Sequence, residues 1–291
     1  MAHKAGYVNI LGNPNVGKST LMNALVGEKL SIITSKAQTT RHRILGIVNG
    51  EEFQIVYSDT PGLLNPTYKL QERMMSFANT AIQDADIILY VCEVGNRDVM
   101  EDYIEKIQNS DIPLIVIINK IDVSNTNIVE ADVEFWKKQF PKAEILPVSA
   151  LHKANLDILI QRLTELLPES PPYFPKDELT DKSMRFFVSE IIREKIFLFY
   201  QKEIPYSVQV VIDSYKEENA LIRISAFIFV ERETQKAIII GHQGNGLKKV
   251  GTTARQDIED FTGKKVFLET FVKVRKNWRA NTRDLDAFGY E

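Results

Sequence analysis

The chain has 291 residues, of which 44% are hydrophobic and 26% charged, and this length leaves room for two domains that each bury a core. No stretch approaches the roughly 18 uninterrupted apolar residues of a membrane-spanning helix, and the first residues lack the pattern of a signal peptide. The single cysteine, Cys92, lies in an apolar run and has no partner for a disulfide within the chain. We therefore expect a cytoplasmic protein with Cys92 in its core.

The formal net charge of −3 is unevenly distributed along the chain. Residues 1–180 carry 17 basic and 23 acidic side chains, a balance of −6, whereas residues 181–291 carry 19 and 16, a balance of +3. Within 241–283 the counts are 10 basic and 4 acidic. A basic region on an otherwise acidic chain favours a polyanionic partner, although a solvated surface has the same composition.

Short apolar runs alternate with helical patterns in the first part of the chain. Strands are predicted at 7–11, 44–48, 53–58, 87–91, 113–119 and 144–148. Helices are predicted at 19–26, 67–83, 98–108, 130–139 and 155–166. This alternation predicts an α/β domain with a mostly parallel sheet and helices on both faces, and Asn49-Gly50 predicts an antiparallel hairpin at its edge.

Residues 12–20 have the sequence Gly-Asn-Pro-Asn-Val-Gly-Lys-Ser-Thr, a phosphate-binding (P-loop) pattern between a predicted strand and a predicted helix. Glycines let the backbone N–H groups turn toward phosphate oxygens, and the helix adds the positive end of its dipole. Lys18 is expected to hold the β- and γ-phosphates, and Ser19 to be a magnesium ligand. The candidate nucleotide-binding residues here are Gly12, Asn13, Asn15, Val16, Gly17, Lys18, Ser19 and Thr20.

The sequence Asn-Lys-Ile-Asp at 119–122 follows a buried strand, at the sheet edge where open α/β sheets bind ligands. The Asp122 carboxylate can accept two N–H groups from guanine, whereas adenine would present an acceptor to it and leave a buried charge unpaired. Ser-Ala-Leu at 149–151 can support the base with backbone N–H groups. The candidate base-binding residues are Asn119, Lys120, Asp122, Ser149, Ala150 and Leu151.

Two further segments predict a magnesium-dependent switch. Asp59, in Asp-Thr-Pro-Gly at 59–62, is placed to hold the metal, and the Gly62 N–H can reach the γ-phosphate. The polar, aperiodic segment 35–41 resembles a mobile loop in which one threonine closes on the metal; we favour Thr40 over Thr39. The predicted metal ligands are Ser19, Thr40 and Asp59, and the predicted catalytic residues are Lys18, Thr40 and Gly62.

Leu63 follows Asp-Thr-Pro-Gly at the position where signalling GTPases carry a glutamine that orients the attacking water. An aliphatic side chain cannot hydrogen-bond to water, so another group must do so. We therefore expect a GTPase, converting GTP and water to GDP and phosphate, whose slow intrinsic turnover rises when a partner binds.

Prolines at 168, 171, 172 and 175 end this periodicity and predict a domain boundary. We expect a GTPase domain at 1–167, a linker at 168–182 and a second domain with a C-terminal tail at 183–291. In the latter, helices are predicted at 184–199 and 247–261, and strands at 207–215, 220–230 and 265–275, with a short apolar run at 237–240.

Gly-His-Gln-Gly at 241–244 predicts a KH-type RNA-binding element in this second domain. Such a turn between two helical segments lets the backbone approach a sugar-phosphate chain, beside an apolar groove for about four unstacked bases. The helix–strand–strand–helix–helix–strand order is that of an α+β type II KH domain. The predicted RNA-binding residues are Gly241, His242, Gln243, Gly244, Lys248 and Lys249.

The five nucleotide motifs, in this order, resemble those of the translation-factor-related GTPases, and Gln-Thr-Thr-Arg at 38–41 resembles the Era-like subgroup. With Arg-Glu-Lys at 193–195 and Glu-Ile-Pro-Tyr-Ser at 203–207, the chain is similar from Val8 to about Trp278 to the Era family, bacterial GTPases with a C-terminal KH domain. The resemblance implies binding near the 3′ end of 16S ribosomal RNA and a role in maturation and assembly of the 30S subunit. It also agrees with the hydrophobic Leu63.

Other functions remain open beside this one. A P-loop kinase for a metabolite is disfavoured by the Asn-Lys-Ile-Asp motif, whereas an RNA chaperone with a structural nucleotide site is a direct alternative. The resemblance further implies peripheral contact with the inner membrane, although no strongly amphipathic basic helix is evident. We expect a monomer.

Overall fold

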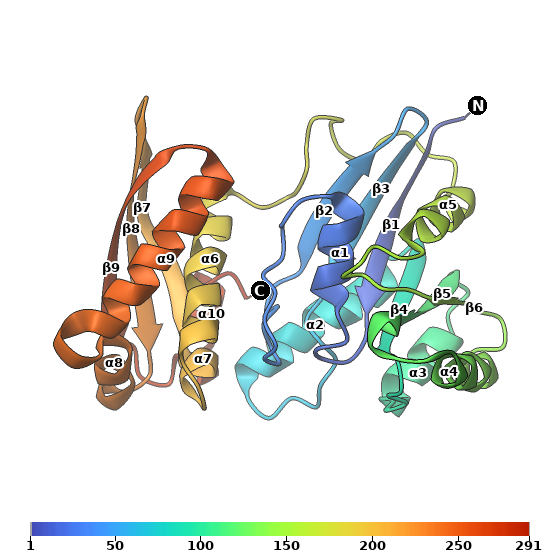
Figure 1. Cartoon of the computed structure of the whole chain (residues 1–291), viewed down its shortest axis with the longest axis horizontal. Coiled ribbons are helices and arrows are strands. Elements are labelled where there is room, and N and C mark those ends of the chain that lie inside the picture. The colour runs from blue at the N-terminus through green and yellow to red at the C-terminus, as the bar shows by residue number, and fades with distance from the viewer. Residues whose placement is uncertain (1, 291) are drawn as a thin grey trace. The chain divides into compact units, whose positions relative to one another are not determined.

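The computed structural model describes residues 2–290 and divides into two compact units (Figure 1). The first unit holds the chain up to Pro66 together with Met74–Asp181, and the second holds Thr67–Arg73 together with the chain from Lys182 onward. No helix within residues 2–290 is long and apolar enough to cross a membrane.

The first unit is built on a six-stranded sheet in the order β2-β3-β1-β4-β5-β6. Only β2 runs antiparallel to its neighbour, and Val48 of β2 lies opposite Ile55 of β3 in the predicted hairpin. All six predicted strands are present. Their bounds are β1 Lys4–Leu11, β2 Ile44–Asn49, β3 Phe53–Asp59, β4 Ile87–Glu93, β5 Leu114–Asn119 and β6 Glu144–Pro147.

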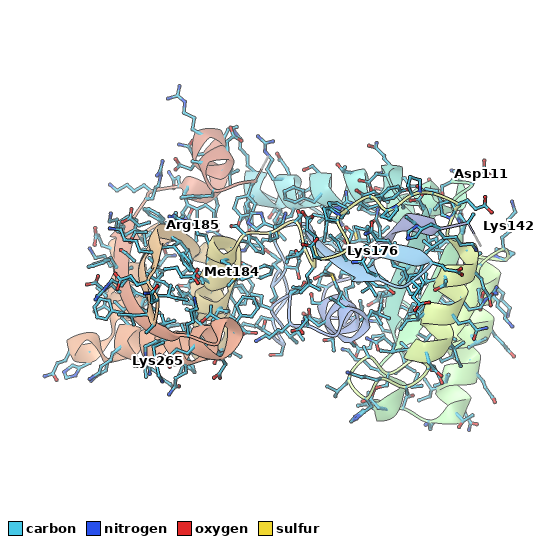
Figure 2. All side chains as sticks on the ribbon, turned by 90° about the horizontal axis from the view of Figure 1, so that it is seen from above. Asp111, Lys142, Lys176, Met184, Arg185 and Lys265 are labelled. Atoms are coloured by element: carbon cyan, nitrogen blue, oxygen red, sulfur yellow. The ribbon has the colours of Figure 1, made fainter. Side chains whose placement is uncertain are left out.

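Helices lie on both faces of this sheet, as the strand–helix alternation predicts (Figures 1 and 2). Their bounds are α1 Lys18–Val26, α2 Lys69–Gln83, α3 Glu101–Gln108, α4 Thr126–Gln139 and α5 Leu156–Leu166, with a 3₁₀ turn η1 at Ile121–Val123. Because both faces are covered, β4 and β5 are almost wholly buried. Cys92 lies in this core, where burial raises the pKa of its thiol.

The proline-rich segment 168–181 lies along the edge of the first unit's sheet. The Gln54 side-chain amide donates to the Phe174 carbonyl (2.8 Å), and the Ile47 N–H donates to the Leu179 carbonyl (2.8 Å). Lys176, labelled in Figure 2, donates to the Gly50 carbonyl in the β2–β3 turn (3.1 Å). These bonds satisfy backbone groups of the edge strand β2, so this segment is an ordered part of the unit.

The second unit has a three-stranded sheet in the order β7-β8-β9, with β8 antiparallel to β7 and parallel to β9. Helices α6 and α9 lie on the same face of it (Figure 1), and their aliphatic side chains form one core with those of the strands. The bounds are α6 Met184–Phe199, α7 Ile204–Ser207, β7 Gln209–Glu217, β8 Leu221–Val230, α8 Glu233–Ile240, η2 His242–Gly244, α9 Asn245–Thr262 and β9 Lys265–Val274. The type II KH order is therefore confirmed, and the run at 237–240 belongs to α8.

The C-terminal tail, which the sequence left without interpretation, is packed onto the second unit. It contains η3 Trp278–Ala280 and α10 Thr282–Ala287. The buried Trp278 donates its indole N–H to the Ser207 carbonyl (3.0 Å), and the buried Tyr290 hydroxyl donates to the side chain of Gln209 (2.8 Å). These bonds hold the tail at one end of the sheet.

Candidate functional site

The phosphate-loop pattern occupies the turn between β1 and α1, where two glycines are required. Gly12 has a φ of 142°, and a Cβ there would lie 2.1 Å from the Val91 carbonyl oxygen of β4. Gly17 has a φ of 97°, and a Cβ there would lie 2.3 Å from the Asn119 side-chain amide. Only glycine combines these backbone angles with so close an approach, so the loop backbone can pass directly against the ends of β4 and β5.

Lys18 is the first residue of α1, and its side chain is buried. Its ammonium group donates to the carbonyl oxygens of Gly12 (2.9 Å) and Asn13 (2.8 Å), across the loop. Burial lowers the pKa of Lys18 to about 8, against the opposing effect of the Asp59 carboxylate. The loop thus holds a partly desolvated cation on which an anion can exert a large stabilising effect.

Ser19, Thr40 and Asp59, from α1, the segment before β2 and the end of β3, meet at one point. The Ser19 Oγ donates to the Asp59 Oδ2 (2.7 Å) and lies 2.9 Å from the Thr40 Oγ1, which in turn lies 3.4 Å from the same carboxylate oxygen. Asp59 Oδ1 is buried with no hydrogen-bond partner among residues 2–290. Burial raises the pKa of the Asp59 carboxyl, and its Ser19 hydrogen bond and the Lys18 charge oppose that shift.

These oxygen ligands fit a magnesium ion. Mg²⁺ prefers one or two protein oxygens together with water and phosphate oxygens, and a buried carboxylate with an unsatisfied oxygen is a favourable partner for it. Thr39 points elsewhere, since its hydroxyl donates to the Lys36 carbonyl (2.7 Å) and contacts the Thr34 hydroxyl (2.6 Å).

A cavity of about 360 Å³ lies over the phosphate loop and is closed by the switch segment. Predicted residues lining it are Asn15, Gly17, Lys18, Ser19, Thr20, Thr40, Gly62 and Lys120. The sequence analysis missed Ile32, Ile33 and Thr34, which also line it, because no motif marks them. Leu63 is 2% exposed, and its N–H donates to the Gly12 carbonyl (3.1 Å), so its side chain is a core residue beside the cavity.

The predicted base-binding residues lie together at the carboxyl ends of β5 and β6. The Asn119 side chain donates to the Val16 carbonyl (2.9 Å) and accepts from the Ala150 N–H (3.0 Å). The Ser149 hydroxyl donates to the Asp122 carboxylate (2.5 Å), which keeps that carboxylate oriented. The base end and the phosphate end of the site are therefore connected through Asn119.

Three other predicted residues have less specific surroundings. Asn13 donates its amide to the Asp98 carbonyl (3.0 Å), outside the cavity lining. Lys120 has a φ of 66°, and its ammonium group pairs with Glu93 (2.8 Å), a neighbour at the end of β4 that the sequence analysis did not single out. Leu151 is 69% exposed, so only its backbone is positioned by the structure.

In the second unit, Gly-His-Gln-Gly forms a tight turn between α8 and α9. Gly241 and Gly244 have φ values of 71° and 78°, and a Cβ on Gly241 would lie 2.9 Å from the Gly246 nitrogen. His242 and Gln243 are exposed. This turn presents backbone to solvent at the start of α9, where the positive end of the helix dipole also lies.

A groove of about 500 Å³ runs from this turn between α9 and β9. Of the six predicted RNA-binding residues, Gly244 and Lys248 line it. Lys249 instead places its ammonium group 4.3 Å from the centre of the Phe199 ring. Arg255, Phe267 and Thr270 also line the groove and were missed, because only the packing of β9 against α9 brings them there.

Comparisons with known proteins agree with both sites. The family model described as 50S ribosome-binding GTPase matches residues 7–120, and the KH domain model matches residues 203–279. GTPase Era of Syntrophus aciditrophicus is 47% identical over 291 residues, covering 99% of this chain and 95% of the relative. GTPase Era of Thermoanaerobacter sp. is 43% identical over 296 residues, covering 100% and 97%.

Two solved structures are similar over 99% of both chains. Era in complex with MgGDPNP and nucleotides 1506–1542 of 16S ribosomal RNA superposes with a TM-score of 0.95 at 40% identity. A variant of Aquifex aeolicus Era bound to GDP·AlF4⁻ superposes with a TM-score of 0.94 at 41% identity.

Proposed function

The chain belongs to the Era family of GTPases, and we propose that it is a GTP-dependent switch that binds 16S ribosomal RNA near its 3′ end and assists assembly of the 30S subunit. It binds guanine nucleotide with Mg²⁺ and hydrolyses GTP. The observation that carries the proposal is that one chain holds a phosphate-loop cavity and a Gly-x-x-Gly groove.

The GTPase chemistry is assigned to residues as follows. The loop N–H groups and Lys18 bind the β- and γ-phosphates, and the Gly62 N–H reaches the γ-phosphate. Ser19, Thr40 and Asp59 hold the metal, which when bound neutralises the negative charge that the phosphates share. Since Lys18 already lies across the loop, it meets the phosphates with little rearrangement.

Selection of guanine is assigned to the carboxyl ends of β5 and β6. Asp122 accepts the two N–H groups of the guanine edge, and Asn119 and Ala150 hold the base against the phosphate loop. The 2.5 Å bond from Ser149 orients the Asp122 carboxylate. ATP would place an acceptor against this carboxylate, which disfavours the metabolite-kinase alternative.

RNA recognition is assigned to the second unit. The exposed turn at 241–244 brings backbone to a sugar-phosphate chain, Lys248 contacts phosphate, and the groove accepts about four unstacked bases. Ten basic and four acidic residues within 241–283 attract a polyanion. We expect the protein to act as a cytoplasmic monomer, with the same basic region available for peripheral contact with anionic lipid.

The experiment that tests this proposal is a titration of an oligonucleotide that matches the 3′ end of the small-subunit RNA. The protein is loaded with a non-hydrolysable GTP analogue or with GDP. The variant carries His242→Asp and Gln243→Asp, which set two carboxylates against the RNA backbone. The control carries Thr126→Asp and Asn127→Asp, which add the same charge at the exposed start of α4 in the other unit.

The proposal predicts tighter binding with the GTP analogue, loss of binding in the turn variant and near-normal binding in the control. Equal affinity in the two nucleotide states would favour the alternative, an RNA chaperone with a structural nucleotide site. Normal binding by the turn variant would remove the KH turn from the mechanism.

A further inference from the structure

The two faces of strands β8 and β9 differ in composition. The side chains that face α6 and α9 are mainly aliphatic and buried, for example Ile222, Ile228 and Val272. The opposite side, which we call the open face, is aromatic and basic, and is defined by Arg223, Phe227, Phe229, Phe267, Phe271 and Lys273.

The open face is unusually apolar for the solvent side of a sheet. Such a side normally carries polar residues, yet Phe267 and Phe271 are each 47% exposed. The Phe271 ring lies 6.2 Å from that of Phe227, so the aromatic surface continues across both strands. The C-terminal tail covers only one end of it, where Phe288 packs on Phe229 (5.4 Å). Exposed clusters of this kind mark interaction sites.

The charges on the open face indicate the chemistry of its partner. Lys273 places its ammonium group 3.2 Å from the centre of the Phe227 ring, and Arg223 places its guanidinium 5.7 Å from that of Phe267. Outward positions of β8 and β9 hold three basic residues, Arg223, Lys265 and Lys273, and one acidic residue, Glu269. A second copy of the chain would bring like charges together, whereas RNA supplies both bases to stack and phosphates to pair.

The open face is continuous with the groove. β9 is the edge strand of the sheet, and Phe267 lines the groove while belonging to the open face. Lys265, labelled in Figure 2, begins the same strand. A chain that leaves the groove over β9 therefore reaches Phe267 first and Phe271 two outward positions further along.

We propose that the open face is a second RNA-contact surface, which stacks unpaired nucleotides next to those held in the groove. Phe267 and Phe271 stack bases, while Lys273 and Arg223 contact phosphates. The inference rests on the proposed function, and it extends the RNA footprint beyond the four or so nucleotides that a KH groove accepts.

The test compares two RNAs on the full chain loaded with the GTP analogue. One is a four-nucleotide core from the 3′ segment, and the other extends this core by six unpaired nucleotides on each side. Phe271→Leu keeps an apolar side chain but removes the stacking ring, and Phe271 does not line the groove. Phe261→Leu is the matched control, because Phe261 is 37% exposed on α9, packs on Phe187 and is not on the open face.

We expect the extended RNA to bind wild type at least about 5-fold more tightly than the core, and Phe271→Leu to lose this gain without changing core affinity. Phe261→Leu should keep the gain, and Lys273→Gln should reduce the salt slope by about 1 for the extended RNA alone. A gain that survives Phe271→Leu would overturn the inference, as would a dimer that this variant dissociates in the absence of RNA. If wild type binds neither RNA, the proposed function itself fails.

Discussion

The side chain of Asn119 joins the two ends of the nucleotide site, because its amide donates to the Val16 carbonyl at 2.9 Å, 103 residues away along the chain. Its carbonyl oxygen accepts from the Ala150 N–H at 3.0 Å. Both bonds are buried, so they position the base-binding edge relative to the phosphate loop whether or not nucleotide is bound.

Asn119→Ala should therefore weaken GTP and GDP binding alike and destabilise the fold. Two buried backbone groups lose their partners, at about 1–3 kcal/mol each. Calorimetric titration with both nucleotides and urea unfolding would measure the two effects. Asn125→Ala removes the cap of α4, whose side chain accepts from Ile128, and should affect stability alone. Unchanged nucleotide affinity in Asn119→Ala would contradict the assigned role.

Asp122→Asn should lower the affinity for GTP by roughly 5- to 100-fold, because the amide places a donor against the guanine N–H groups. Xanthosine triphosphate has a carbonyl in place of the guanine amino group, so it should bind the variant better than GTP does. Competition binding with both nucleotides measures the exchange of preference. An equal loss for the two would mean that Asp122 acts only through its bond to Ser149.

Lys18 should titrate near pH 8 in the nucleotide-free protein and at a higher pH once phosphate oxygens surround it. The unfolded chain keeps the proton up to about 10.5, so between pH 8 and 10.5 it binds more protons than the fold. The stability of the nucleotide-free protein should therefore rise with pH across that window. Lysine NMR titration would measure the pKa, with Lys18→Gln identifying the signal. A pKa near 10.5 without nucleotide would refute this.

Thr40→Val should reduce hydrolysis and magnesium affinity at least about 10-fold, because its hydroxyl lies beside Ser19 and Asp59. Thr39→Val is the matched control, since that hydroxyl bonds to the Lys36 carbonyl instead. Single-turnover hydrolysis over a magnesium series separates the two variants. Larger defects in Thr39→Val would exchange the assignments.

Intrinsic GTP hydrolysis should be slow, on the order of 10⁻⁴ to 10⁻² s⁻¹, because the buried Leu63 side chain cannot orient water. The rate should rise when the RNA or the ribosomal partner is added. Single-turnover assays with and without the 3′ RNA would measure both. A basal rate above about 1 s⁻¹ would show that another residue already positions the water.

The order of strands and helices could be predicted because hydrophobic periodicity is a local property. The six strands of the first unit lie within a few residues of their predicted positions. The small helices α7 and α10 were not predicted, since their few residues are stabilised by tertiary contacts such as the bond from Trp278 to Ser207.

The sequence by itself determined the phosphate loop, the guanine motif and the Gly-x-x-Gly turn, because each is contiguous and depends on backbone freedom and charge. Only the tertiary structure decided how distant groups meet, as when Asn119 reaches Val16 or when Thr40 rather than Thr39 approaches Asp59. It also decided that β9 turns Phe267 and Phe271 outward. Alternation along a strand defines two faces, but which face is buried depends on the side where α6 and α9 pack.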